Sequence, residues 1–178
     1  MKTVLTIAGS DCGGAGGIQS DIKTITAHRL YATSAITAMT AQNTTGVTAI
    51  MNVTPDVLGA QIDAVFTDIR PKAVKIGMVS VPELIDVIAD RLARYNAENV
   101  VLDPVMVATS GAKLISDDAV EVMTGKLFPL ARLITPNIPE TEALTGISVK
   151  SAADMENAAR CIYGKYGCAV LVKGGHSI

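Results

Sequence analysis

Short apolar runs rich in β-branched residues alternate along this chain with longer stretches in which apolar residues recur every three or four positions. The short runs predict strands, and the longer stretches predict helices with one buried face. Strands are predicted at 4–7, 33–41, 73–76, 100–102, 133–134 and 169–172. An alternating segment at 47–51 predicts a β excursion off the main sheet. Strands that are apolar on both faces and separated by helices indicate an α/β fold with a mainly parallel sheet.

Capping residues mark where the predicted helices begin. Thr54 is followed by a proline, which suits an N-cap and the first helical position, and Ser80 precedes a glutamate by three positions, the spacing of a capping box. Ser116 and Ser151 each precede an acidic first turn, which also favours an N-cap. A further helix is predicted around 18–25, where isoleucines recur on one face.

The composition excludes several classes of protein. Hydrophobic residues make up 49% of the 178 residues, and the mean hydropathy is +0.37, which excludes a disordered chain. The net charge of −2 leaves no excess of cations to coat a phosphate backbone, so no nucleic-acid partner is expected. No apolar run approaches the roughly 20 residues of a membrane helix, so no membrane partner is expected. We expect residues 1–178 to form a single domain.

The three cysteines predict no covalent framework. Cys12, Cys161 and Cys168 are odd in number and have no C-x-x-C spacing, so neither a set of disulfides nor a zinc site is expected. A reduced, cytoplasmic location fits this pattern.

Ligands of open α/β sheets bind beyond the carboxyl ends of the strands, so the residues that follow each predicted strand are the candidates for a site. Each predicted strand is followed by a polar or glycine-rich segment. These segments are residues 9–21, 41–46, 77–78, 103–106, 135–142 and 173–176. The first segment is rich in glycine, which allows close approach to a ligand and can aim N–H groups at it. Its spacing fits neither of the common nucleotide-binding glycine motifs, and a flexible turn before a helix is the alternative.

Each of the other segments has a functional and a structural interpretation. Gln42 can donate to and accept from a heterocycle, or be solvated. Asp103 can hold Mg²⁺ through water, or form an Asx turn. Asn137 and Glu140 can contact a metal and phosphates, or cap a short helix that begins at Pro139. The methionine at 78 suits either a flat apolar pocket or the core, and the lysine at 173 suits either a ligand or solvent.

Taken together, these segments resemble the hydroxymethylpyrimidine/phosphomethylpyrimidine kinases of thiamine biosynthesis, which belong to the ribokinase-like superfamily. The matching segments keep the order and spacing of the family over the whole chain: 8–11 with the glycine loop, 18–24, 41–44, 75–78, 102–105, 135–140 and 172–176. The resemblance implies a ribokinase-like three-layer α/β sandwich whose central, mostly parallel sheet is flanked by helices.

The resemblance also implies an activity and a site. The activity is the transfer of the γ-phosphoryl group of ATP, with Mg²⁺, to the hydroxymethyl oxygen of 4-amino-5-hydroxymethyl-2-methylpyrimidine and then to the resulting monophosphate. By position, the implied substrate-binding residues are Gly9, Asp21, Gln42, Met78 and Val105. The implied nucleotide and metal residues are Asp103, Asn137 and Lys173 for the nucleotide, and Asp103 and Glu140 for Mg²⁺.

The sequence departs from the family in two places. The glycine loop begins with Cys12 where the family usually has serine or proline, which changes the side chains but not the length of the loop. The family's Gly-Thr-Gly-Cys segment, which supplies an anion hole and the proposed catalytic base, does not occur, so no catalytic residue is assigned and the chain is expected to be incomplete at its C-terminus.

Several alternatives remain open from the sequence. A pyridoxal kinase of the same fold is the nearest one, and Gln42 is the residue that separates the two, because pyridoxal-selective relatives tend to differ there. A catalytically inactive pyrimidine-binding fragment is another. A homodimer is expected from the resemblance, and residues 44–53 either pack on a neighbouring molecule or cover the substrate.

We expect the purified 178-residue chain to show little or no kinase activity. Loss of a hydrogen-bond donor that stabilises the transition state typically costs about 10²–10³ in rate, and the segment that provides these donors in the family is not among these residues. The measurement is ATP consumption in the presence of the aminopyrimidine alcohol. Rapid turnover would contradict the expectation.

Overall fold

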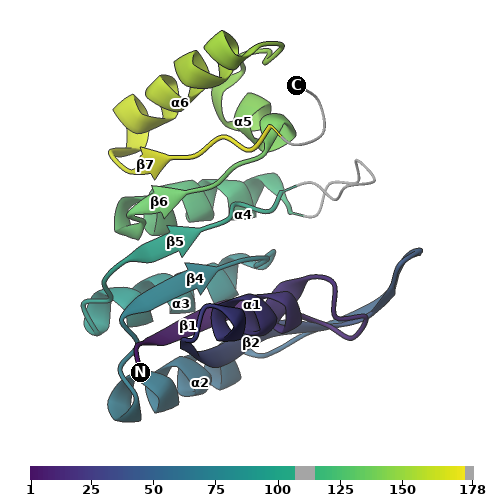
Figure 1. The fold of residues 1–178 in the computed structure, drawn as a ribbon, viewed down its shortest axis with the longest axis vertical. Helices are drawn as coiled ribbons and strands as arrows, with labels where there is room; N and C mark the ends of the chain where they lie inside the picture. Colours follow the sequence, from purple (N-terminus) through teal and green to yellow (C-terminus); the bar gives the residue numbers. More distant parts are fainter. Residues whose placement is uncertain (107–114, 175–178) are drawn as a thin grey trace.

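The fold is built on one seven-stranded sheet (Figure 1). The computed structural model describes residues 1–106 and 115–174. The strands are β1 (Thr3–Asp11), β2 (Tyr31–Asn43), β3 (Gly46–Asn52), β4 (Ala73–Ile76), β5 (Val100–Leu102), β6 (Leu133–Ile134) and β7 (Ala169–Val170). The helices are α1 (Gly17–Ala27), α2 (Pro55–Asp68), α3 (Pro82–Arg94), α4 (Asp117–Val122), η1 (Met123–Leu127), η2 (Phe128–Leu130), α5 (Ile138–Thr145) and α6 (Ala152–Tyr166).

The strand order is β3-β2-β1-β4-β5-β6-β7, and every neighbouring pair except β2–β3 is parallel. The predicted excursion off the sheet at 47–51 is wrong, because β3 pairs with β2 as an antiparallel edge strand of the same sheet. β3 pairs with residues 38–43 of β2 along the edge opposite to β1, so the end of β2 has β1 on one side and β3 on the other. This hairpin leaves Met39, Ile50 and Met51 exposed.

Two layers of helices cover the sheet to different extents. α1 lies over β1 and β2 on one face, and α2, α3 and α4 lie on the other (Figure 1). The main core lies between the sheet and this second layer, and its fully buried residues include Leu5, Ile7, Leu58, Ile76 and Ile88. These side chains pack strands β1 and β4 against helices α2 and α3, and so hold the carboxyl ends of the two strands next to each other.

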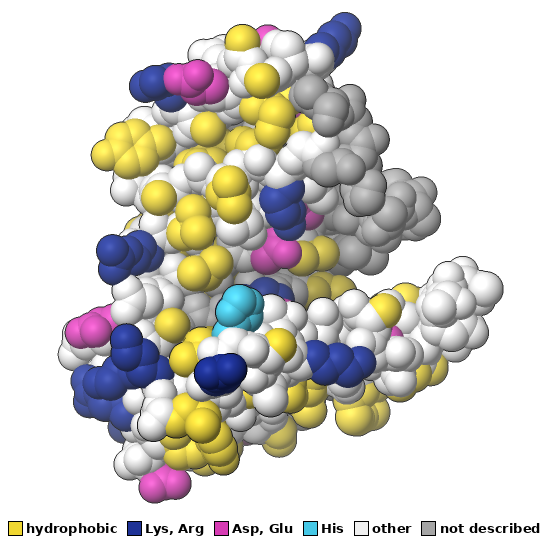
Figure 2. Space-filling view, in the orientation of Figure 1, with side chains coloured by type: hydrophobic (Ala, Val, Ile, Leu, Met, Phe, Trp, Pro, Cys, Tyr) yellow, Lys and Arg dark blue, Asp and Glu magenta, His cyan; other side chains and the backbone are white. Residues whose placement is uncertain are grey.

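The register defines one row of side chains across the face that α1 covers. Thr6, Lys75, Val101, Leu133 and Ala169 are successive register partners from β1 to β7. Exposure rises along this row, from the buried threonine beneath α1 to the exposed alanine on β7. Figure 2 shows hydrophobic side chains at the surface over the part of the sheet that α1 leaves uncovered.

The capping predictions are confirmed at three of the four helices. Thr54, Ser116 and Ser151 each accept a hydrogen bond from a backbone N–H in the first turn of the helix that follows. The capping box at Ser80 is wrong, because α3 begins with Pro82 after a valine that makes no side-chain cap. Proline at the first helical position has no N–H to satisfy and its φ is already helical, so the helix can begin there without a polar cap.

The helix that Ser116 caps is regular only in its first part. α4 ends at Val122. The chain then forms a π-helical turn, η1, and a 3₁₀ turn, η2, which contains Pro129. Within residues 1–106 and 115–174, no helix is long and apolar enough to cross a membrane.

A polar clamp joins α2 to the end of α3. The Tyr95 hydroxyl donates to Asp63 Oδ1 at 2.8 Å, and Arg91 Nε donates to Asp63 Oδ2 at 3.1 Å. The Tyr95 ring also stacks on Phe66, with centroids 4.8 Å apart. Burial raises the pKa of Asp63, but the hydrogen bonds from Tyr95 and Arg91 outweigh it, and the pKa lies below its usual value. The clamp is therefore fully formed at neutral pH.

Substituting Tyr95→Phe should lower the midpoint of urea denaturation at neutral pH by roughly half a molar, because it removes a hydrogen bond to a charged group but keeps the ring stack. The difference should shrink as pH falls through the lowered pKa of Asp63, because stability that depends on an ionised carboxylate is lost on protonation. Tyr163→Phe on exposed α6 is the control, and an equal loss there would contradict the clamp.

Candidate functional site

The parallel strands bring the predicted site residues to one edge of the sheet. β1, β4, β5 and β6 are neighbours and point the same way, so the residues after them lie along the same edge. The contacts divide the predicted residues into two groups. One group, near β1, β2 and β4, contains Gly9, Asp21, Gln42 and Met78. The other, near β5, β6 and the residues after β7, contains Asp103, Val105, Asn137, Glu140 and Lys173.

An ion pair joins two of the predicted nucleotide residues. Lys173 Nζ lies 2.7 Å from Asp103 Oδ1, although the two residues are 70 positions apart in the sequence. The backbone of Lys173 is held by its own N–H, which donates to the carbonyl of Pro136 at 2.8 Å, and by a parallel β-bridge to Asn137. The turn after Asp103 is made by the backbone, because Val105 N–H donates to the Asp103 carbonyl at 2.9 Å. The Asp103 side chain therefore faces Lys173 instead of forming an Asx turn.

Glu140 is a buried carboxylate with both oxygens engaged. Oε2 accepts from Asn137 N–H at 2.8 Å, and Oε1 accepts from Met106 N–H at 3.2 Å. In return, Asn137 Oδ1 accepts from Glu140 N–H at 2.8 Å, which completes a capping box at the start of α5. Burial raises the pKa of Glu140, although the hydrogen bonds from Asn137 and Met106 act in the opposite direction.

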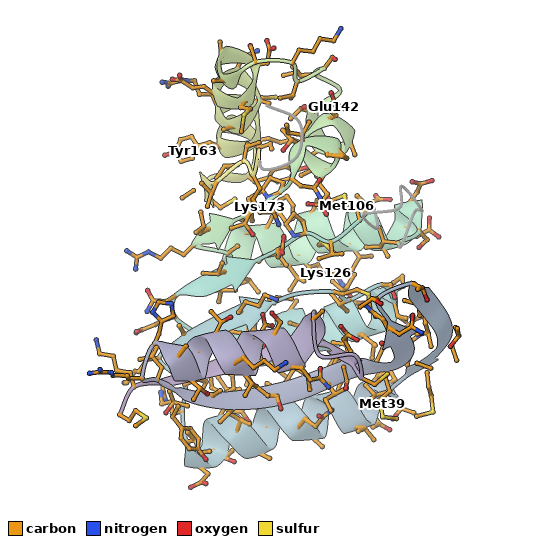
Figure 3. The ribbon with its side chains drawn as sticks, turned by 45° about the vertical axis from the view of Figure 1, so that its right-hand side comes forward. Met39, Met106, Lys126, Glu142, Tyr163 and Lys173 are labelled. Atoms are coloured by element: carbon orange, nitrogen blue, oxygen red, sulfur yellow. The ribbon has the colours of Figure 1, made fainter. Side chains whose placement is uncertain are left out.

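Asn137 and Glu140 therefore cap the helix, which is the structural alternative considered for them from the sequence. The helix begins at Ile138, one residue before the predicted start. Glu140 also ties α5 to the chain that follows β5, where Met106 lies (Figure 3). The cap thus holds the backbone around Asp103 and Lys173 in place. Of the predicted segment 173–176, Gly175 and His176 lie outside the described residues.

The glycine loop is organised around a residue that the sequence interpretation did not assign, Asp11. Its Oδ1 accepts from Gly13 N–H at 2.8 Å, and its Oδ2 accepts from Ala15 N–H at 3.1 Å and Gly16 N–H at 2.8 Å. The Gly16 hydrogen bond is the largest of the effects that hold the pKa of Asp11 below its usual value, with burial opposing it. The expectation that the loop aims these N–H groups at a ligand is therefore wrong, because they point at the protein's own carboxylate.

Close approach requires glycine at one position of this segment and leaves little space at a second. A Cβ at Gly17, where φ is +55°, would lie 2.2 Å from the carbonyl oxygen of Gly9, so only glycine fits between the loop and β1. A Cβ at Gly9 would lie 3.0 Å from the terminal carbon of Met78. The structure thus brings Gly9 and Met78 into contact. The Met78 carbonyl accepts from the Thr37 hydroxyl at 2.9 Å, which fixes its backbone.

Asp21 lies on α1 and faces the sheet. Its Oδ2 accepts from Thr6 Oγ1 at 2.5 Å and from Lys75 Nζ at 2.9 Å. Lys75 is a second residue that the sequence interpretation did not assign to the site. The sequence held a signal for it, because Lys75 is the charged residue of the otherwise apolar strand Ala73–Ile76, and a charge on a covered face of a sheet needs a partner.

Gln42 lies near the end of β2 and is anchored to the glycine loop. Its backbone N–H donates to Cys12 Sγ at 3.2 Å, and its backbone carbonyl oxygen accepts from the Cys12 thiol at 3.1 Å. Its side-chain oxygen accepts from the Thr40 hydroxyl at 3.2 Å, which leaves the amide N–H groups without a protein partner in the described part of the chain. Over the same residues, no hydrogen bond joins Gln42 to Asp21, and each approaches the edge from its own element.

Carboxylate oxygen is a ligand that Mg²⁺ prefers, and Asp103 is a carboxylate that this edge presents. Among residues 1–106 and 115–174, no three His, Cys, Asp or Glu side chains group together as a metal cage. A site that binds Mg²⁺ through one carboxylate, phosphate oxygens and water is compatible with this arrangement, because Mg²⁺ usually keeps several waters.

The chain is similar to proteins of known family. The family model for phosphomethylpyrimidine kinase matches residues 11–178. A hydroxymethylpyrimidine/phosphomethylpyrimidine kinase of Rhizobium meliloti is 51% identical over 173 residues, which cover 97% of this chain and 65% of that protein. The crystal structure of phosphomethylpyrimidine kinase from Clostridium difficile has a TM-score of 0.93 and 47% identity over 99% of this chain and 77% of that one.

Pyridoxal kinases are more distant structural neighbours. The Staphylococcus aureus pyridoxal kinase in complex with AMP-PCP and pyridoxal has a TM-score of 0.86 and 33% identity, over 99% of this chain and 63% of that one. These neighbours confirm the predicted ribokinase-like α/β class. The chain spans about two thirds of the length of the curated hydroxymethylpyrimidine/phosphomethylpyrimidine kinases that it matches. From the family match and the identity to these relatives, this chain belongs to the phosphomethylpyrimidine kinase family.

Proposed function

We propose that this chain provides the pyrimidine-binding side of an ATP-dependent kinase. Its substrate is 4-amino-5-hydroxymethyl-2-methylpyrimidine, which accepts a phosphoryl group on its hydroxymethyl oxygen and then, as the monophosphate, accepts a second one. The observation that carries the proposal is the Asp21 carboxylate, because Thr6 and Lys75 hold one of its oxygens and the other remains for a ligand.

The pyrimidine side needs an acceptor for the exocyclic amino group and a surface for the flat ring. Asp21 Oδ1 has no hydrogen-bond partner in the described part of the chain. Every fully buried side-chain oxygen in that part has a partner, so the unpaired Oδ1 is not fully buried. This atom is therefore open to accept from the amino group. Gln42 would contact the ring through its free amide N–H groups, with Gly9 and Met78 as one wall and Val105 as another.

The phosphate side needs cationic groups that neutralise charge. Lys173 is a cation that the edge presents there, and its contact with Asp103 keeps it at the end of β5. Lys173 and Asn137 would contact the nucleotide of ATP, and Asp103 would bind Mg²⁺ through its second oxygen. Glu140 would support the ion by holding Asn137 and Met106 instead of by offering a free oxygen.

Phosphoryl transfer depends on positioning and charge neutralisation more than on covalent chemistry by the protein. Magnesium bound with ATP would supply most of the neutralising charge. The residues of this chain would orient the hydroxymethyl group towards the phosphates, because the ring-binding and phosphate-binding groups project from the same edge of the sheet.

A pyridoxal kinase is the second candidate, and the likeness to the Staphylococcus aureus enzyme supports it. The identity is lower, however, at 33% against 47% for the solved phosphomethylpyrimidine kinase. A carboxylate acceptor such as Asp21 also suits the amino group of the aminopyrimidine, and pyridoxal carries no amino group on its ring. We therefore favour the pyrimidine.

Isothermal titration calorimetry of the 178-residue chain with the aminopyrimidine alcohol tests the proposal. We expect saturable binding, and Asp21→Asn should weaken it about 10–100-fold, because a hydrogen bond to a charged group contributes about 1.5–3 kcal/mol. Asp86→Asn is the matched control, since Asp86 is also paired with a lysine but lies on the exposed face of α3. The absence of binding heat, or an equal loss in both variants, would contradict the proposal.

Replacing Gln42 tests the choice between the two alcohols. We expect the unaltered chain to bind the aminopyrimidine more tightly than pyridoxal. Gln42→Leu should reduce this preference by about tenfold, because it removes the amide that pairs with the ring but keeps a side chain of similar size. Competition titrations with both ligands provide the measurement. A preference for pyridoxal in the unaltered chain would favour the second candidate.

A further inference from the structure

We propose that Lys75 is a positioning residue that sets selectivity for aminopyrimidines by fixing the orientation of the Asp21 carboxylate. This inference rests on the proposed function, because it concerns the same ring-binding site. Lys75 itself does not contact the ring in this proposal. It acts through Asp21, and its effect should therefore depend on whether the ligand carries the amino group that Asp21 binds.

The sheet register brings two donors to one carboxylate oxygen. Thr6 on β1 and Lys75 on β4 are register partners in neighbouring parallel strands, so their side chains leave the same face of the sheet side by side. α1 crosses this face and places Asp21 above them. The hydroxyl and the ammonium group both bind Oδ2, at 2.5 and 2.9 Å. Rotation of the carboxylate would break both contacts together, so Oδ1 has a defined direction.

Stability alone does not account for a lysine at this position. The side chains of Lys75 and Asp21 are 29% and 18% exposed, so both charges lie partly out of water. A pair in such a place gains little net stability, because loss of hydration offsets much of the attraction. The strand neighbours Val74 and Ile76 are fully buried and apolar. A lysine in this strand is better explained by the orientation that it gives to Asp21.

The residues after β4 leave room for the ammonium group. A Cβ at Gly77 would lie 2.7 Å from Lys75 Nζ and 3.0 Å from the Ala8 side chain, so any larger residue there would push the ammonium group away from Asp21. Gly77 is buried, and its N–H donates to the carbonyl of Ile7 at 2.9 Å, which fixes it against β1. The Lys75 ammonium group thus lies between the backbone of Gly77 and the carboxylate of Asp21.

The test compares two ligands on the 178-residue chain by calorimetry: 4-amino-5-hydroxymethyl-2-methylpyrimidine and the analogue that lacks the 4-amino group. Lys75→Met should weaken binding of the amino compound by about tenfold or more and change binding of the analogue by less than about twofold. Lys75→Arg should restore only part of the preference, because it keeps the charge but a guanidinium group is larger than the ammonium group that fits beside Gly77. Lys126→Met is the control, since Lys126 (labelled in Figure 3) forms a 2.7 Å pair with Asp86 in which both side chains are exposed.

The outcomes separate this inference from the proposed function. Equal losses for the two ligands in Lys75→Met, or no loss for either, would overturn the role of Lys75 while the binding site stands. If the unaltered chain binds neither ligand, the proposed function fails and the inference fails with it. Circular dichroism checks that each variant is folded. If Lys75→Met is unfolded, Lys75→Gln provides the same comparison, because it also removes the charge but keeps a polar side chain.

Discussion

The parallel pairing of β1 with β4, and of β5 with its neighbours, is the constraint on which the whole site depends. Parallel strands run towards the same edge of the sheet, so residues that follow them arrive at that edge even when they are far apart in the sequence. The Lys173–Asp103 pair is the clearest result, because it spans 70 positions of the sequence within 2.7 Å. The antiparallel strand β3 extends only the far side of this sheet and does not disturb the arrangement.

Carboxylates at this edge serve two different purposes. Asp11 and Glu140 are buried, and backbone N–H groups occupy the oxygens of both, so they shape the glycine loop and the start of α5. Asp21 and Asp103 are partly exposed and are paired with lysines through one oxygen each. The first pair builds the frame, and the second pair is available to a ligand. A chain with several acidic residues at strand ends therefore does not present all of them as binding groups.

The comparisons and the geometry support the same proposal from independent directions. Identity of about half to phosphomethylpyrimidine kinases shows the family. Within that family, the contact that we propose between Asp21 and the amino group would distinguish a ring with this group from one without it. Pyridoxal kinases share the fold at lower identity, which is consistent with a common frame whose ligand preference depends on a few side chains at this edge.

The sequence alone determined most of the strands, the fold class and the set of polar segments at the strand ends, because hydrophobic periodicity and local capping depend on residues close together in the chain. Tertiary structure decided what each polar residue does. The sequence showed that Asp11 precedes a glycine loop, but only the folded loop shows that its N–H groups turn inward to that carboxylate. It placed Lys75 in a strand and Asp21 in a helix, but their contact joins residues 54 positions apart and exists only once α1 packs across the sheet.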